Sequence, residues 1–139
     1  MQLAISTTAN GETINLEGKC LYTWRNGDTF EGEWKGEYRP HAGKFTSKRD
    51  GDTYDGQWEN GNCHGKGVAT YKDEGKIYSG PWHNGLREGQ GKVTMKNGDS
   101  YVVNFVQDLE EGAGVLTEKI SGHTHKIHFR HGKRLWTLC

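Results

Sequence analysis

The chain has 139 residues, of which 32% are hydrophobic and 21 are glycine. An ordinary two-layer globular domain is a poor candidate, because the apolar content is concentrated in a few large aromatic side chains. The 18 basic and 18 acidic residues cancel, which argues against a domain-wide interface for nucleic acid. No run of about 18 apolar residues is present to span a membrane.

Two features bear on the cellular location. No lysine or arginine precedes Lys19, unlike a secretory or mitochondrial targeting segment. The three cysteines, Cys20, Cys63 and Cys139, are odd in number and lack Cys-x-x-Cys spacing. We therefore expect free thiols in a reducing compartment and a cytoplasmic protein.

A short motif of an aromatic residue, a glycine and a tryptophan recurs along the chain. The tryptophans of the motif, and two phenylalanines that continue the series, recur at intervals of about 24 residues, a period that indicates a repeat architecture. We therefore expect a single array over residues 1–139. The motif and its continuation comprise Phe30–Trp34, Tyr54–Trp58, Tyr78–Trp82, Phe105 and Phe129.

The period divides the chain into units of similar length. We expect a degenerate N-terminal unit, four repeats and a partial C-terminal unit. In chain order these units span residues 1–29, 30–53, 54–77, 78–100, 101–124 and 125–139.

Each unit contains two short runs with the period-two alternation of β-strands. In the best-preserved unit the runs are Tyr54–Trp58 and Gly65–Tyr71, and the connection between them contains Asn60-Gly61. Glycine turns bound these runs, and no segment has the apolar spacing of a helix. The sequence therefore predicts an all-β fold, an elongated and twisted single-layer antiparallel meander of tandem hairpins.

Alternation places the aromatic residues and the strand glycines on one face of this sheet. A glycine inside a strand leaves room for a ring that lies across it, so we expect these glycines to accept rings. The alternative is that they only make turns. The expected structural glycines are Gly32, Gly56, Gly67, Gly80, Gly91 and Gly114.

The opposite face is polar, with acids in the first strand of a unit and bases in the second. Examples are Glu31 and Asp55 in first strands, and Lys66 and Lys92 in second strands. Opposite charges that face each other across a ladder stabilise a sheet by about 0.2–1 kcal/mol per pair. We therefore expect the charges on this face to neutralise one another without a ligand.

The combined pattern resembles the MORN repeat (membrane occupation and recognition nexus). The resemblance extends over roughly residues 18–132 and is strongest in the two central units. It implies tandem β-hairpins and scaffolding in cytoskeletal, ciliary and junctional assemblies, with anionic phospholipid binding or end-to-end dimers in some members. The matching positions are Tyr54, Gly56, Trp58, Asn60, Gly61, Gly65, Gly67, Tyr71 and Gly75, then Tyr78, Gly80, Trp82, Asn84, Gly85, Gly89, Gly91 and Gly98.

Departures from the pattern concern Pro81 and the C-terminal units. Pro81 removes a ladder donor in mid-strand, so we expect a bulge or a local edge there. In the unit from Tyr101, Val103 replaces the strand glycine and Phe105 replaces the tryptophan. We therefore expect the weakest stacking at the C-terminal end, with an edge that pairs with a partner strand or a second copy.

Candidate metal ligands are confined to four histidines within residues 123–131. Alternation separates His125 from His128, and no Cys, Asp or Glu lies among them to complete a tetrahedral site. We expect neither a metal nor a cofactor.

Candidate catalytic residues are few. The pairs Cys63-His64 and Ser79 with His83 have no orienting acid in a predicted pocket. The glycines of Gly65-Lys66-Gly67 begin a strand, whereas a phosphate-binding loop needs them to open a helix. We therefore expect no enzymatic activity.

A single-layer sheet leaves its rings half exposed along an apolar groove, which is typical of a protein-binding surface. We predict a non-catalytic scaffold that holds an extended or helical segment of a partner protein in this groove, within a ciliary or cytoskeletal assembly. The expected groove residues are Phe30, Trp34, Tyr54, Trp58, Tyr71, Tyr78, Trp82, Tyr101 and Phe105.

Two alternatives stay open. The first is a phospholipid-binding membrane tether, although the lysines are matched by acids and no cluster of four or more basic residues is present. The second is an accessory subunit that regulates an enzyme. Nucleic acid is not expected as a partner.

Overall fold

The computed structural model describes residues 4–6, 16–36 and 41–135, and the side chains of residues 21–32 and 41–135. The described residues form one sheet of thirteen strands and contain no helix. The strands are β1 (Ala4–Ser6), β2 (Leu16–Thr23), β3 (Thr29–Gly36), β4 (Ala42–Thr46), β5 (Thr53–Glu59), β6 (Asn62–Tyr71), β7 (Lys76–His83), β8 (Leu86–Arg87), β9 (Gly89–Thr94), β10 (Ser100–Val106), β11 (Leu109–Thr117), β12 (Thr124–Arg130) and β13 (Lys133–Leu135).

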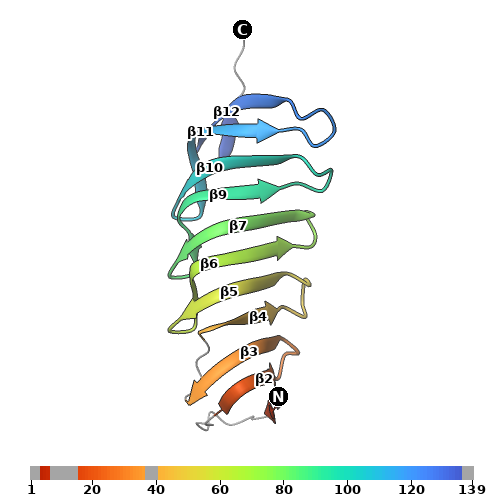
Figure 1. The fold of residues 1–139 in the computed structure, drawn as a ribbon, viewed down its shortest axis with the longest axis vertical. Coiled ribbons are helices and arrows are strands. Elements are labelled where there is room, and N and C mark those ends of the chain that lie inside the picture. Colours follow the sequence, from red (N-terminus) through yellow and green to blue (C-terminus); the bar gives the residue numbers. More distant parts are fainter. Residues whose placement is uncertain (1–3, 7–15, 37–40, 136–139) are drawn as a thin grey trace.

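The strands follow one another across the sheet in chain order (Figure 1). Neighbouring strands are antiparallel except β1 and β2, which are parallel, and the short strand β8 pairs with β7 beside the main path. The strands cross the long axis, so the first and last strands lie at opposite ends of an elongated array. The predicted all-β antiparallel meander is confirmed.

Narrow two-residue turns close one side of the array. Both residues of each turn have a positive φ, for example 52° at Asn60 and 79° at Gly61. This is the geometry of the type I′ turn, whose twist matches that of the strands it joins. The narrow turns are Asn60-Gly61, Asn84-Gly85, Gln107-Asp108 and His131-Gly132.

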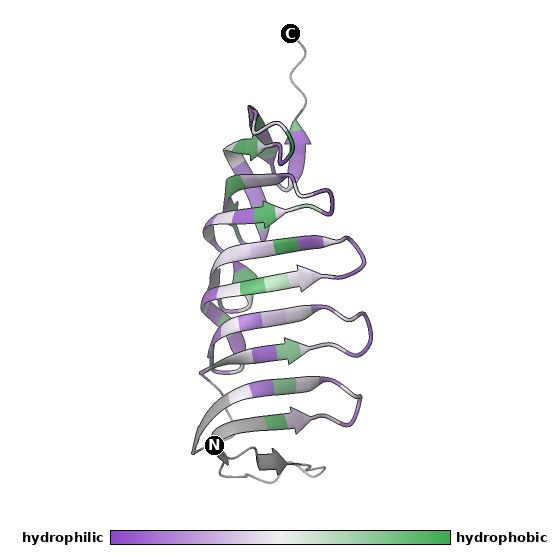
Figure 2. Ribbon diagram, turned by 45° about the vertical axis from the view of Figure 1, so that its right-hand side comes forward, coloured by the Kyte–Doolittle hydropathy of each residue, from purple (hydrophilic) through white to green (hydrophobic). Residues whose placement is uncertain are grey.

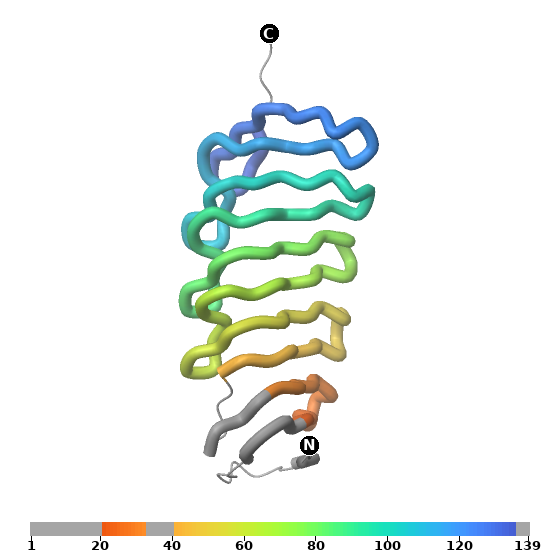
Figure 3. Tube along the Cα trace, in the orientation of Figure 1, coloured from red at the N-terminus to blue at the C-terminus, as the bar shows by residue number. Residues whose placement is uncertain are grey.

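Wide loops close the opposite side and stack on one another (Figure 3). The backbone N–H of Lys72 donates to Oδ1 of Asp52 in the preceding loop (2.9 Å). The Lys72 side chain also lies against Gly51, where an added Cβ would be 2.7 Å from its Cδ. The same hydrogen bond joins Lys48 to Asp28 and Lys119 to Asp99.

The hairpins β5–β6 and β10–β11 are irregular at the same place, where the pairing register shifts. In β5–β6, Gly56 pairs with Gly67, but Trp58 pairs with Cys63. The shift recurs in β10–β11 after Val102. Such irregularities bend a strand and increase its twist, so each of these strand pairs turns a corner here.

Pro81 lies at the equivalent corner of the hairpin between them. Strand β7 pairs with β9 up to Ser79 and with β8 from Trp82, so the ladder on this side is interrupted beside Pro81. The Pro81 carbonyl still accepts a hydrogen bond from the backbone N–H of Glu88 (3.2 Å). The predicted irregularity is confirmed, and it explains how a residue without an N–H is accommodated in mid-strand.

A row of glycines crosses the sheet beside these corners. A Cβ added to Gly67 would lie 2.2 Å from Oη of Tyr54, and one added to Gly91 would lie 2.4 Å from a ring carbon of Tyr78. The rings therefore lie directly on glycine backbone, as predicted. Five consecutive strands place a glycine at the same register position, namely Gly32, Gly43, Gly56, Gly67 and Gly80.

Gly114 has a different environment from the other structural glycines. An added Cβ would lie 2.6 Å from the carbonyl oxygen of Val102 and 3.1 Å from Cβ of Val103. An aliphatic side chain, rather than a ring, occupies this place, because Val103 has replaced the strand glycine of its repeat.

Aromatic contacts link neighbouring repeats inside the bend, edge-to-face in the central repeats and stacked between Tyr101 and Phe129. The ring of Tyr54 contacts Trp58 in its own repeat (centroids 4.9 Å apart) and Trp82 in the next (5.1 Å). Tyr78 likewise contacts Trp82 (5.2 Å) and Phe105 (5.0 Å). Apolar segments lie within the strands, whereas the loops are polar (Figure 2). The core comprises Tyr54, Ala69, Tyr78, Trp82, Val93, Tyr101, Val103, Phe105, Ile127 and Phe129.

The polar atoms of the core side chains Tyr54, Tyr78 and Trp82 bond to backbone carbonyls. Oη of Tyr78 donates to the Pro81 oxygen (2.7 Å), and Nε1 of Trp82 donates to the Gly67 oxygen (3.3 Å). Burial without these bonds would leave unsatisfied donors. Equivalent bonds join Tyr54 to Gln57 and Trp58 to Gly43.

The expectation that the aromatic rings are half exposed is wrong for most of them. The sheet bends at the glycine row, so rings from both limbs of a strand pack against one another instead of facing an open surface. Trp58 and Tyr71 are partly buried, and the side chain of Trp34 lies outside the described residues. The buried members of the predicted groove are Phe30, Tyr54, Tyr78, Trp82, Tyr101 and Phe105.

Gly67→Ala tests whether ring-on-glycine contact holds the bend. The added methyl group has no space beside Tyr54, and overpacking of this kind costs about 1–3 kcal/mol. Urea unfolding followed by tryptophan fluorescence measures the loss. The control Ser79→Ala removes an exposed hydroxyl, and we expect a change within about 0.5 kcal/mol. Equal stability of both variants would contradict the packing described.

Because of Tyr78, the free energy of unfolding should decrease as the pH rises in the alkaline range. Burial raises the pKa of Tyr78 to about 12, whereas an unfolded tyrosine ionises near pH 10. Its contribution is fully present below pH 10 and is lost as pH rises from 10 toward 12. The free energy of unfolding of both proteins should fall between pH 8 and pH 11, and the fall should be about 1 kcal/mol smaller for Tyr78→Phe than for wild type. Parallel pH profiles of the two proteins would refute this.

Candidate functional site

A polar cavity opens in the aromatic face between the two rows of connections. Its volume is about 260 Å³. One wall comes from the end of β6, the following wide loop and β7. The other comes from β8, β9, the turn between β10 and β11, β11, and the turn between β12 and β13. The lining residues are Tyr71, Glu74, Lys76, Tyr78, Arg87, Val93, Asp108, Glu110 and Gly132.

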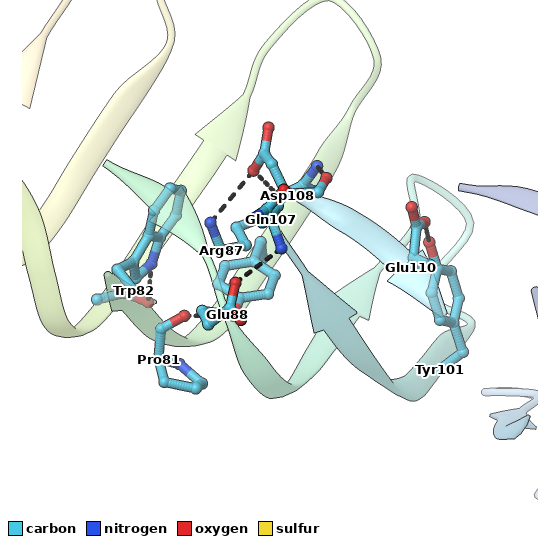
Figure 4. A network of polar contacts seen from close by, with 10 residues as sticks. Pro81, Trp82, Arg87, Glu88, Tyr101, Gln107, Asp108 and Glu110 are labelled. Atoms are coloured by element: carbon cyan, nitrogen blue, oxygen red, sulfur yellow. Dashed lines mark hydrogen bonds and ion pairs between the residues drawn. The ribbon is translucent and has the colours of Figure 1, made fainter. Parts of the chain in front are cut away.

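Arg87 and Asp108 form the polar centre of one wall (Figure 4). Nε of Arg87 donates to Oδ1 of Asp108, and a terminal nitrogen donates to the Asp108 carbonyl oxygen, both at 2.7 Å. The two backbones are also bonded, because the Asp108 N–H donates to the Arg87 oxygen (2.9 Å). Adjacent repeats are therefore joined by side chain and main chain at this point.

The guanidinium of Arg87 lies over three aromatic rings. Its carbon is 4.8 Å from the ring centre of Phe105, 5.6 Å from that of Tyr78 and 5.8 Å from that of Tyr71. Each distance is within the range of cation–π attraction. Burial lowers the pKa of Arg87, but the hydrogen bond to Asp108 and the nearby acids outweigh it, so the pKa is raised. The cavity thus has a fixed positive group on an aromatic floor.

Glu110 places a carboxylate at the inner face one repeat further along. It accepts a hydrogen bond from Oη of Tyr101 (2.7 Å). The burial of the ring and this bond raise the pKa of Tyr101, so the phenol stays neutral. In the preceding repeats the same register position carries Arg87 and Cys63, which shows that side-chain chemistry varies along this line.

The cavity brings together only part of the predicted groove. Tyr71 and Tyr78 line it, Phe105 lies beneath Arg87, and Tyr101 reaches it through Glu110. The other predicted members with described side chains do not line the cavity. They are Phe30, Tyr54, Trp58 and Trp82.

Arg87, Asp108, Glu110 and Glu74 are site residues that the sequence interpretation missed. A signal was present at Gln107-Asp108, which replaces the Asn-Gly of the preceding narrow turns. An acid in a turn position that favours glycine indicates a role for its side chain. The partner of that acid, Arg87, lies in the preceding repeat and is not indicated by the repeat pattern.

The prediction that the charges of the outer face neutralise one another is correct only for the N-terminal strands. Glu31, Lys44 and Asp55 are direct neighbours on β3, β4 and β5, as predicted. From β6 to β12 Lys66, Lys92 and Lys126 face uncharged residues instead, and Arg130 faces another base, Lys133. Lys66 lies opposite Pro81, and Lys92 lies between Ser79 and Val102. Charge pairing across the ladder is therefore limited to the N-terminal strands.

The C-terminal histidines pair with separate acids. The His125 ring contacts the Glu118 carboxylate, which lowers the pKa of Glu118, and Nδ1 of His131 lies 2.8 Å from Oε1 of Glu111. Across the described part of the chain, no three His, Cys, Asp or Glu side chains are grouped to hold a metal ion.

In the pair Cys63-His64 the histidine does have an acid beside it, Glu59, contrary to the expectation from the sequence, but the thiol is not activated. Burial raises the pKa of Cys63 to about 11, which disfavours the reactive thiolate. The ring of His64 is engaged elsewhere, because Nδ1 accepts the Asn84 N–H (3.3 Å) and Nε2 lies 3.1 Å from Glu59.

Comparison with known families agrees with the repeated geometry. Residues 15–29, 54–76 and 78–100 match the model of the MORN repeat. The second and third matches carry the glycine row, the narrow Asn-Gly turns and the Tyr–Trp contacts described above. A search of curated proteins finds no match for this chain. Among the described residues, none forms a helix with the length and hydrophobicity of a membrane span. The chain therefore carries MORN repeats at these three segments.

Proposed function

We propose that this chain is a non-catalytic structural subunit that holds a partner protein against the polar cavity of its inner face. MORN repeats occur in scaffolds that bind proteins and membranes. The observation that carries the proposal is the cavity itself, where Tyr71 remains partly exposed above the buried core. An aromatic side chain beside a fixed ion pair is typical of positions that dominate protein interfaces.

The chemistry of the cavity favours a peptide side chain as its occupant. Three acids, Glu74, Asp108 and Glu110, and two bases, Lys76 and Arg87, line it together with aromatic rings. A partner amide, hydroxyl or ammonium group finds acceptors there, and an apolar stem finds the Tyr71 ring. The volume of about 260 Å³ suits one or two side chains better than a lipid chain.

We also propose the kind of cellular assembly in which this subunit acts. A ciliary or cytoskeletal assembly is what the MORN resemblance implies, and a membrane tether or a regulatory subunit of an enzyme is the alternative. Fluorescence microscopy of the tagged chain in its own cells distinguishes a filament or axoneme pattern from a membrane outline.

Photo-crosslinking at Tyr71 tests the inner-face interface. Tyr71→benzoylphenylalanine keeps an aromatic ring at the cavity, and Asp73→benzoylphenylalanine places the same probe in the adjacent exposed loop. In the cells that make the protein, we expect a discrete protein adduct from position 71 and none from position 73. Equal labelling at both positions, or no protein adduct at position 71, would rule out the proposed interface.

The affinity for the crosslinked partner then measures how much the Tyr71 ring contributes to the binding free energy. Because hot-spot residues contribute about 2 kcal/mol or more, Tyr71→Ala should weaken the affinity at least about 30-fold. The matched variant Ile77→Ala removes an exposed apolar side chain from the outer face and should leave the affinity unchanged. Calorimetry with both variants gives the comparison.

A further inference from the structure

One row of outward-facing residues runs unbroken across six strands of the C-terminal part of the array. Its members are Cα partners from strand to strand, with side chains on the face opposite the aromatic core. Because neighbouring strands are about 4.8 Å apart, the row is about 24 Å long. In spatial order the outer row is Val68, Ser79, Lys92, Val102, Val115 and Lys126.

The bases on and beside the outer row have no acidic partner. Throughout the described part of the chain, the charged side chains of these bases enter no ion pair. Two acids on the same face, Glu88 and Glu111, bond to the backbone N–H groups of Gln107 and His131 at the narrow turns. A third, Asp55, lies opposite Val68 at the β5 end of the row, away from Lys92 and Lys126. The outward bases of β6 to β13 are Lys66, Lys92, Lys126, Arg130 and Lys133.

Two hollows interrupt this face where the sheet bends. The larger, about 660 Å³, has Asp55, Lys66, Val68 and Pro81 in its lining. The smaller, about 460 Å³, lies at the other end of the row and includes Val115 and Lys126. The glycine row accounts for the hollows, because positions without side chains lie at the corner. Val68 and Val115 are 39% and 47% exposed. The hollow at Val115 therefore combines an apolar wall with a base, and the hollow at Val68 combines an apolar wall with a base and the acid Asp55.

We propose that the outer row binds an extended, acidic segment of a partner protein that lies across the strands. Lys92 and Lys126 are separated by three strand spacings, about 14 Å, which an extended chain covers in about four residues. Carboxylates at that separation therefore reach both lysines. An apolar residue between them lies over Val102 and Val115. This occupant lies on the face opposite the polar cavity and does not depend on the proposed function.

A protein segment fits these features better than a membrane surface does. A bilayer presents a broad charged plane and attracts dense basic clusters, whereas here single bases alternate with valines. The hollows are recessed from such a plane, but a side chain of an extended segment can enter them. Charge and shape therefore both favour a peptide over lipid headgroups.

The test uses the full chain and a labelled eight-residue peptide with glutamates at its second and sixth positions and valine and leucine between them. Fluorescence anisotropy at low salt should show binding that weakens as salt is added. A peptide with glutamines in place of the glutamates should bind at least tenfold more weakly. The double variant Lys92→Glu/Lys126→Glu should also lose at least tenfold.

Matched controls separate a specific site from general charge. Lys44→Glu, on the same face of β4 between Glu31 and Asp55, makes the same charge change as the single variant Lys92→Glu. It should alter binding less than twofold, whereas Lys92→Glu alone should weaken binding more than Lys44→Glu does. Circular dichroism confirms that each variant is folded. Equal binding of both peptides, or equal loss from Lys44→Glu and the double variant, overturns the proposal.

A vesicle arm distinguishes the lipid alternative. If phosphatidylserine vesicles co-sediment the wild-type protein at all, they should co-sediment the double variant to the same extent. Co-sedimentation that depends on Lys92 and Lys126, combined with no binding of the acidic peptide, would assign this face to membranes and overturn the proposal.

Discussion

The close contact between an aromatic ring and the glycine backbone of the adjacent strand is the constraint on which the rest of the structure depends. Tyr54 occupies the space where Gly67 would carry a Cβ, and Tyr78 does the same at Gly91. Because glycine recurs at this register position across β3 to β7, these repeats bend along the same line. The bend turns a sheet that is apolar on one face into an array with its own core, with rings from neighbouring repeats in edge contact.

Neighbouring repeats are held on both sides of that core by polar contacts. Wide loops stack through bonds such as Lys72 to Asp52, and narrow turns stack through backbone bonds such as Gly85 to Cys63. Each contact joins only adjacent repeats, as expected for a quasi-one-dimensional array whose stability depends on nearest neighbours. The polar cavity arises where Arg87 departs from the repeated pattern. Local substitutions can therefore create a site without changing the fold.

The period, the strand faces and the ring-on-glycine contacts could be predicted, because each depends on local alternation and on residues without a Cβ. The burial of Tyr78 and Phe105 could not, because it requires the irregular pairing that bends the hairpins. The bonds between Lys and Asp of successive wide loops were also missed, since each joins the backbone of one loop to a side chain of another. The same holds for Arg87 and Asp108, whose contact is visible only when adjacent repeats are stacked.

Burial of the aromatic face within a bent sheet is the central claim, and hydroxyl-radical footprinting with mass spectrometry tests it most directly. Tyr54, Tyr78 and Phe105 are buried, whereas Trp24 is 38% exposed and Tyr71 is partly exposed. The native protein should therefore show rapid oxidation of Trp24 and Tyr71 and strong protection of the three buried rings, which is lost in urea. Oxidation of Tyr78 and Phe105 at the rate of Tyr71 in the native state would mean that the sheet is open, and would contradict this account.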